Sequence, residues 1–318
     1  MFSIKDRRSF LRGLLGSAGA TALGTTFPGL RGVAVAQSES IMAQVLRNDL
    51  TLLQGAGGNM LLLRRPAGAV LVDSGSPEHA AELGARVSAE GTSVELLFNT
   101  HWHLDHTGAN EVFSAAGATI VAHENTRLWM STEYYVDWQD HTYVPRPTAA
   151  LPTRTFYSHE PQPIVLELGS HARVEYGHLP NAHTDGDIYV FFPEHNVIAA
   201  GGAVAAGAYP VLDYATGGWI GGLMDSTRRL LELSDANTLV VPAIGPAQAR
   251  SHLQAQYQMI ATVRERVENL MRQGKSAKEM IAAGVTDEFD AGWGNNRDLF
   301  LTNVYNGLWW QGRLDGSL

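Results

Sequence analysis

Short apolar runs and longer amphipathic stretches alternate along most of the chain. Runs of four or five apolar residues, bounded by turns rich in Gly, Pro and Asn, are typical of buried β-strands. They occupy residues 50–53, 60–63, 69–73, 94–98, 118–121, 164–168, 172–176, 188–192, 197–200 and 239–242. Apolar residues at helical spacing predict helices over about 78–89, 219–233, 247–272, 276–283 and 298–310. This order of elements predicts a mixed α/β domain.

Residues from about 132 to 163 interrupt this rhythm. The segment is rich in prolines and in aromatic or imidazole side chains, namely Tyr134, Tyr135, Trp138, His141, Tyr143, Phe156 and Tyr157. A long connection without regular structure favours a binding loop or lid, and aromatic side chains with polar tips suit the wall of a substrate pocket. An aromatic flap over the core and a contact between subunits are equally compatible with this composition.

The N-terminus has the pattern of an export signal. Arg7-Arg8 is followed by Phe10 and Leu11, a mildly apolar Gly/Ala/Leu stretch, and Ala34-Val35-Ala36 as a cleavage site. We therefore expect residues 1–36 to be a twin-arginine signal peptide that engages the twin-arginine export machinery and delivers residues 37–318 to the periplasm or the exterior. An uncleaved anchor or a disordered tail is the alternative. Twin-arginine export generally carries folded proteins, which would suit metal loading in the cytoplasm.

Charge and composition narrow the classes of partner. Loss of residues 1–36 removes five basic residues and one acidic residue, which changes the net charge from -9 to -13. An acidic protein without a basic stripe is a poor candidate for nucleic acid or an anionic membrane, and no later stretch is long and apolar enough for stable membrane insertion. Cysteine is absent, so disulfides and thiolate metal ligands are excluded. An apolar share of 45% is typical of a globular chain with a large core. We expect residues 37–318 to form a single domain with a helical C-terminal segment.

The densest chemistry lies directly after the predicted strand at 94–98. His101 and His103 are spaced to place two imidazoles on one side of the chain, as two ligands of one cation require. Asp105 and His106 follow closely and could serve a neighbouring position. His183, in a loop before the strand at 188–192, could supply a third nitrogen. The sequence offers neither a Gly-rich phosphate loop nor a G-x-S-x-G serine elbow.

With these motifs the chain resembles the metallo-β-lactamase superfamily over about residues 43–246. The resemblance is carried by Asp73 at a strand end, by the H-x-H-x-D-H loop at 101–106, and by His183 within His-Thr-Asp-Gly-Asp. It implies a four-layer αββα sandwich, a metal centre at one edge of the paired sheets, and hydrolysis by metal-bound hydroxide. Asp73 is expected to hold a ligand in place, with a purely structural corner as the alternative.

Two positions depart from the family pattern. Gly202 stands where the family often has a bridging Asp or a Cys, and Ile244 stands where many members have a His. A zinc ion would keep three imidazoles and a water as its ligands, whereas the second position would keep only Asp105 and His106. We therefore expect one tightly bound zinc and a weak or absent second ion. His178 is a less favoured substitute ligand.

These residues predict a metallo-hydrolase acting on a small-molecule ester, lactone, thioester or amide, of which a β-lactam is one possibility. Zinc-bound hydroxide would attack the carbonyl, Asp105 would orient that hydroxide and transfer its proton, and His106 would hold Asp105 or a water. Because both departures remove ligands of the same site, a non-catalytic periplasmic binding or scaffold protein on the same fold is the alternative. Redox or oxygen chemistry at iron is a weaker hypothesis, since the bridging carboxylate is missing.

Overall fold

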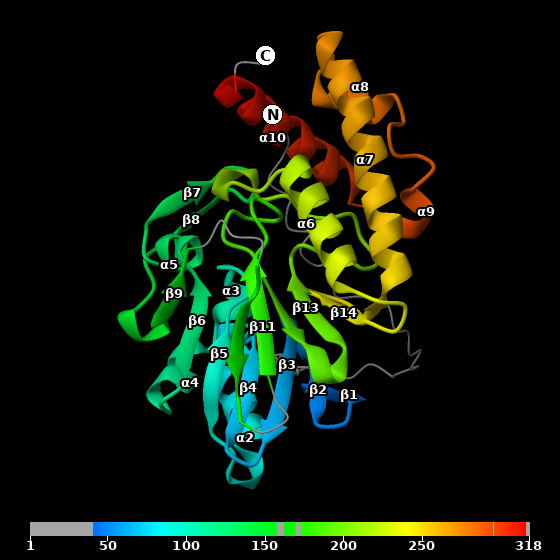
Figure 1. Ribbon diagram of the computed structural model, residues 1–318. Helices are drawn as coiled ribbons and strands as arrows, with labels where there is room; N and C mark the ends of the chain where they lie inside the picture. Colours follow the sequence, from blue (N-terminus) through cyan, green and yellow to red (C-terminus); the bar gives the residue numbers. More distant parts are fainter. Residues whose placement is uncertain (1–40, 158–161, 170–172, 295, 316–318) are drawn as a thin grey trace, which may run out of the picture. The chain divides into compact units, whose positions relative to one another are not determined.

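The computed structural model describes residues 41–157, 162–169, 173–294 and 296–315, so the expected signal peptide lies outside the described residues. Two sheets lie face to face and helices cover the outer face of each (Figure 1). The first sheet has the order β1-β2-β3-β4-β5-β6-β9 and the second has the order β10-β11-β12-β13-β14-β15. The expected four-layer αββα sandwich is thereby confirmed.

The strands of the first sheet are β1 (Met42–Arg47), β2 (Leu50–Ala56), β3 (Gly58–Arg65), β4 (Gly68–Val72), β5 (Val94–Phe98), β6 (Thr119–His123) and β9 (Arg154–Phe156). Strands β1 to β4 form an antiparallel meander, and β4, β5, β6 and β9 run parallel. Because parallel strands end at the same edge of a sheet, the loops after β4, β5 and β6 meet there. Asp73 and the histidine motif are therefore neighbours in space.

The strands of the second sheet are β10 (Ile164–Glu167), β11 (Arg173–His178), β12 (Ile188–Phe192), β13 (Val197–Gly201), β14 (Leu239–Pro242) and β15 (Gln248–Ala249). Strands β10 to β13 pair antiparallel, β13 and β14 pair parallel, and β15 closes the edge in antiparallel orientation. The loop between β11 and β12 carries His183, and Gly202 follows β13. These loops approach the same edge as the histidine motif of the first sheet.

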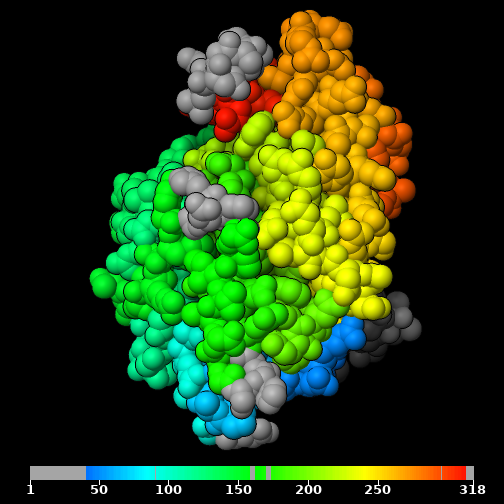
Figure 2. All heavy atoms as spheres, in the orientation of Figure 1, coloured from blue at the N-terminus to red at the C-terminus, as the bar shows by residue number. Residues whose placement is uncertain are grey.

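The helices are α2 (Ala80–Val87), α3 (Leu104–Thr107), α4 (Asn110–Ala115), α5 (Glu124–Met130), α6 (Ile220–Leu233), α7 (Arg250–Arg272), α8 (Ala277–Ala282), α9 (Asp290–Trp293) and α10 (Arg297–Asp315). Helices α2 and α4 cover the first sheet, whereas α6, α7 and α10 cover the second. Figure 2 shows the side chains of α6 (yellow-green to yellow) and α7 (yellow to orange) in close contact on the surface. None of the described helices is long and apolar enough to cross a membrane.

Alternation along the strands divides the core into layers. In β4, Val70 and Val72 face the second sheet, whereas Ala69 and Leu71 face α2 and α4. In β12, Val190 lies between the sheets. Successive side chains of a strand point to opposite faces, so strands that are covered on both sides are apolar at nearly every position. This explains the continuous apolar runs of the sequence.

The aromatic insert contains more regular structure than its composition predicts. Strands β7 (Tyr134–Val136) and β8 (His141–Tyr143) form a hairpin, and β9 adds a parallel strand to the first sheet beside β6. Three-residue strands among prolines are too short for a readable alternation, which is why the expectation of an irregular connection was wrong. Tyr134 and Tyr143 pack edge-on against buried Trp102 of the histidine motif. The insert therefore packs against the ligand loop.

Candidate metal centre

The turn after β5 is fixed by Asp73. The residue has a left-handed backbone (φ 60°), which turns its carboxylate back toward the neighbouring strand end. Oδ1 accepts a hydrogen bond from the Thr100 backbone amide (2.7 Å), and Oδ2 accepts one from the Thr100 hydroxyl (2.7 Å). Asp73 therefore holds the start of the histidine motif, which matches the supporting role expected from its place at a strand end.

Three histidines from two distant loops converge. The ligand atoms of His101, His103 and His183 all lie within 4.8 Å of one another, and His183 Nε2 is 3.0 Å from His103 Nδ1. His101 is 1% exposed and His183 is 5% exposed, while His103 is partly exposed. The structure thus brings the three predicted nitrogen ligands together. In the described residues, these three form the cluster with metal-ligand spacing.

The outward nitrogen of each ring faces an oxygen. Thr100 donates its hydroxyl proton to Asp73, so its oxygen accepts from His101 Nδ1 (3.0 Å). His183 Nδ1 donates to the Val211 carbonyl (2.6 Å), and His103 Nε2 donates to Asp213 Oδ2 (3.1 Å). A ring that carries a single proton therefore carries it on its outward nitrogen.

The other nitrogen of each ring then presents a lone pair to a common space. Burial, together with the neighbouring imidazoles, lowers the pKa of His183 to about 4 and that of His101 well below its usual value. Both rings are therefore neutral at pH 7 and ready to bind a metal. Three converging imidazole nitrogens fit a cation, and such nitrogens suit zinc at about 2.0–2.1 Å.

Asp105 and His106 lie beside the three histidines. His106 Nδ1 is 2.9 Å from Asp73 Oδ2, and its Nε2 is 3.6 Å from Asp105 Oδ2. Burial alone would lower the pKa of His106, but the carboxylates of Asp105 and Asp73 outweigh it and raise the pKa to about 9. The opposite holds for Asp105, since burial raises its pKa but His106 and His103 bring it below the usual value. The two residues that the sequence suggested for a second metal therefore lie side by side, and His106 lies between the carboxylates of Asp105 and Asp73.

The two departures from the family pattern have different surroundings. A Cβ atom at Gly202 would lie 2.2 Å from Cδ2 and 2.9 Å from Cβ of His183, so the ring of His183 fills the space of a side chain there. Ile244 is 52% exposed in the loop after β14. His178 donates through Nε2 to the Asp185 carbonyl (2.9 Å) and stacks on His123, and it is not part of the histidine cluster.

Sequence reasoning missed the residues that hold the ligands from behind. Asp187 Oδ2 accepts from the backbone amides of His183 (2.6 Å) and Thr184 (2.7 Å), and Asp213 is buried against His103. The His-Thr-Asp-Gly-Asp spacing is a signal for the first, because an Asp four residues on can cap such a turn. Asp213 carries no local signal, since its partner lies 110 residues away.

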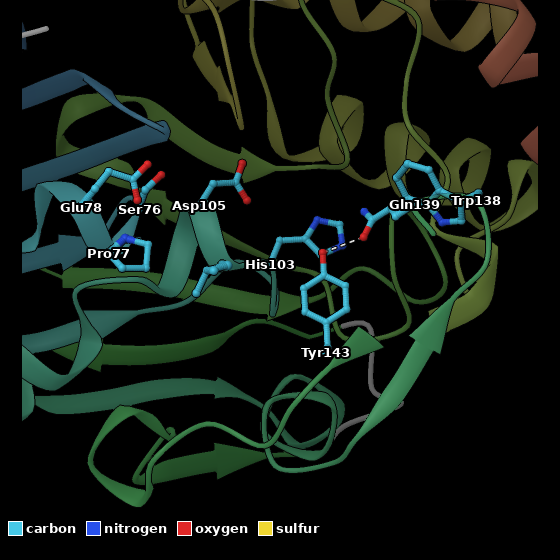
Figure 3. Close-up of a pocket in the computed structure, with 9 residues that line it drawn as sticks. Ser76, Pro77, Glu78, His103, Asp105, Trp138, Gln139 and Tyr143 are labelled. Atoms are coloured by element: carbon cyan, nitrogen blue, oxygen red, sulfur yellow. Dashed lines mark hydrogen bonds between the residues drawn. The ribbon is translucent and has the colours of Figure 1, made fainter. Parts of the chain in front are cut away.

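A cavity of about 320 Å³ opens beside the cluster. His103 and Asp105 lie between the segment that precedes α2 on one side of the cavity and the insert on the other (Figure 3). The lining residues are Ser76, Pro77, Glu78, His103, Leu104, Asp105, Trp138, Gln139 and Tyr143. The Tyr143 hydroxyl donates to Gln139 Oε1 (2.6 Å), which fixes the wall formed by the insert.

Comparison with known proteins agrees with this geometry. The family model described as the metallo-beta-lactamase superfamily matches residues 53–254. The structure is similar to a metallo-beta-lactamase from Pontibacter korlensis, with a TM-score of 0.56 and 19% identity over 70% of this chain and 99% of that chain. It is also similar to one from Erythrobacter litoralis, with a TM-score of 0.56 and 18% identity over 70% of this chain and 96% of that one.

A third similar structure, the DIM-1 metallo-beta-lactamase, has a TM-score of 0.57 and 16% identity over 70% of this chain and 98% of that one. A comparison with curated protein sequences finds no match. At these identities the structural likeness establishes the fold, while the family model spans more than half of the chain. The protein belongs to the metallo-β-lactamase superfamily.

Proposed function

We propose that the protein is a zinc-dependent hydrolase that cleaves an ester, lactone, thioester or amide with water. The observation that carries the proposal is the convergence of three imidazoles whose outward nitrogens already face oxygen partners. His101, His103 and His183 would hold the ion. Zinc supplies Lewis acidity and lowers the pKa of a coordinated water to about 7.

Asp105 has the properties of the proton acceptor. Its carboxylate lines the cavity beside His103, and its pKa is held below the usual value, so the carboxylate is ionised at neutral pH. It would accept a proton from the attacking water and return it to the leaving group. The imidazolium of His106, itself held by Asp73, would fix the orientation of Asp105 through their 3.6 Å contact.

We propose a single tightly held ion. Gly202 cannot bind a cation, and the ring of His183 fills the space beside it. Ile244 is likewise unable to bind a cation. His106 contacts both Asp105 and Asp73, and its pKa is raised to about 9. A second ion would therefore have to displace the proton that His106 carries. One equivalent of zinc is therefore expected.

The cavity favours a substrate without a carboxylate next to the scissile bond. Its lining contains two carboxylates, Glu78 and Asp105, and the aromatic wall of the insert, but no Lys or Arg among the described lining residues. A β-lactam carries a carboxylate that would lack a cationic partner here, whereas a neutral ester or lactone requires only the metal and an apolar wall. We therefore propose neutral acyl compounds as the preferred class.

The test combines metal analysis with a panel of substrates. Protein purified without chelators is expected to contain one zinc per chain and to hydrolyse neutral aryl esters or lactones faster than β-lactams. His101→Ala is expected to lose metal and activity together. His195→Ala, which removes a histidine that faces Asp49 far from the cluster, serves as the control. Activity that survives both chelation and His101→Ala would overturn the proposal.

A second candidate is a binding or scaffold protein with a partly lost metal centre. The observation that favours it is that Gly202 and Ile244 both remove ligands of one site. The two candidates differ in a simple measurement. A zinc-loaded protein that binds acyl compounds without turnover of any member of the panel would support the second candidate.

We also propose export by the twin-arginine route to the periplasm or the exterior. The support is the sequence of residues 1–36, with Arg7-Arg8 and the Ala34-Val35-Ala36 site. Fractionation of cells that express the full chain is expected to give a shortened protein outside the cytoplasm. Arg7→Lys with Arg8→Lys is expected to retain the precursor inside, and export of this variant at the normal level would contradict the proposal.

A further inference from the structure

We propose that Asp213 and Trp138 are positioning residues for the metal ligand His103, so that the aromatic insert is a working part of the metal centre. The inference rests on the proposed metal-dependent function and goes beyond it. It assigns a role to two residues that touch neither the expected ion nor the carbonyl that would be attacked. The hairpin of β7 and β8 then controls ligand geometry as well as the shape of the cavity.

Asp213 is fully buried, and both of its carboxylate oxygens accept hydrogen bonds. Oδ2 accepts from His103 Nε2 (3.1 Å) and from the Thr216 hydroxyl (2.7 Å), while Oδ1 accepts from the indole Nε1 of Trp138 (3.0 Å). A buried carboxylate with three donors has a single orientation.

This orientation decides which nitrogen of His103 faces the ion. A carboxylate at Nε2 keeps the proton there, so the lone pair stays on Nδ1, the atom that lies 3.0 Å from His183 Nε2. A carboxylate behind a metal-binding imidazole also raises its basicity, and its removal typically costs about 10–100-fold in metal affinity. Asp213 is thus placed to set both the direction and the strength of one ligand.

Trp138 reaches Asp213 from the cavity side. It lies between β7 and β8, and its ring lines the cavity together with Gln139 and Tyr143 (Figure 3). The neighbouring Asp137 accepts hydrogen bonds from the Tyr214 hydroxyl (2.7 and 2.8 Å), so the turn of the hairpin is fastened to the segment that carries Asp213. A displacement of this hairpin would remove one donor from the carboxylate.

A second hydrogen-bonded chain joins the same parts. Trp102, between two of the ligands, donates through Nε1 to Thr216 Oγ1 (3.2 Å), and Thr216 donates to Asp213. The same segment supplies the Val211 carbonyl to His183. Residues 211–216 therefore orient two of the three ligands, and Trp138 is the point at which the insert acts on this segment.

The experiment measures Co²⁺ binding to the metal-free mature protein, residues 37–318. The visible spectrum of Co²⁺ reports ligand geometry without any turnover. Asp213→Asn keeps the shape of the side chain but lets an amide face His103, and we expect about 10–100-fold weaker binding and an altered spectrum. Trp138→Phe keeps the ring and removes only the indole donor, and we expect a smaller loss, of about 10-fold or less, with the same direction of spectral change. Trp310→Phe, at an exposed site in α10, is the control and is expected to match the unmodified protein.

Each outcome has a distinct meaning. Unmodified protein that takes up no Co²⁺ or Zn²⁺ would overturn the proposed function and the inference together. Normal uptake with unchanged affinity and spectrum in both Asp213→Asn and Trp138→Phe would overturn the inference alone. An effect of Asp213→Asn without any effect of Trp138→Phe would remove the insert from the metal centre. Thermal melting of the metal-free variants shows whether each is folded, and the milder Trp138→Phe keeps the test valid if Asp213→Asn does not fold.

Discussion

Gly202→Ala offers a sharp test of the metal centre because it adds one methyl group at a defined contact. A Cβ atom there would lie 2.2 Å from Cδ2, 2.5 Å from Cγ and 2.9 Å from Cβ of His183. Rotation of the ring alone does not relieve the contact, since the Cβ of His183 is also too close. The whole side chain, or the backbone on either side, has to move.

The required movement is large on the scale of metal coordination. Ordinary van der Waals contact begins near 3.4 Å, so the ring has to retreat by about 1.2 Å, whereas metal-ligand distances tolerate about 0.2 Å. Retreat is opposed on two sides, because the His183 amide is held by Asp187 (2.6 Å) and its Nδ1 by Val211 (2.6 Å). Loss of a ligand should cost at least the 10–100-fold typical of a supporting residue, and overpacking should cost about 1–3 kcal/mol of stability.

The assay is a Zn²⁺ competition titration together with urea unfolding of the metal-free protein. Gly292→Ala is the matched control, because a Cβ atom there meets no neighbour within 4 Å and the residue has no left-handed backbone. We expect Gly202→Ala to bind zinc about 10–100-fold more weakly or worse, and Gly292→Ala to bind it normally. Wild-type zinc affinity in Gly202→Ala would refute the argument that His183 is confined by this glycine.

Two further predictions concern pH and substrate charge. The pKa of His106 is raised to about 9, so the stability that its ionised ring contributes to the metal-free protein should be lost as the pH rises from 6.5 toward 9, by on the order of 3 kcal/mol. Urea unfolding of the unmodified protein and of His106→Gln at pH 6.5 and 9 isolates this contribution, and an equal change of stability in both proteins would contradict the assignment. A choline ester and its uncharged dimethylbutyl analogue should both be cleaved with higher kcat/KM than the hemisuccinate ester of the dimethylbutyl alcohol. Equal kcat/KM values for the three esters would show that the carboxylates of the cavity do not select substrates.

Local spacing carried most of what the sequence predicted. The spacing of His101 and His103 after a strand, and His183 before the next buried strand, are short-range patterns that the parallel strand ends bring to one edge. The sequence did not identify Asp213 as a partner of a metal ligand, because its contact with His103 joins residues that are 110 positions apart. No local pattern indicates a contact at that separation. The insert was recognised by its aromatic residues, but β9 was missed because three residues between prolines do not establish a period.

The pair Gly202→Asp and Ile244→His would restore the missing ligands if the second site were lost through side chains alone. Ile244 is exposed, and its loop is held by Asn59, whose amide donates to the Ala243 carbonyl (2.7 Å) and whose Nδ2 donates to the Gly245 carbonyl (2.7 Å), so a histidine fits there and should change stability by less than about 0.5 kcal/mol.

Position 202 is different, because any side chain begins inside the volume of His183. We therefore expect Ile244→His alone to keep one zinc per chain, and the double variant to hold less than one rather than two. Metal analysis after gel filtration decides between these outcomes. Two equivalents in the double variant would mean that His183 has room to yield, and that the second site was lost through its ligands and not through the packing around His183.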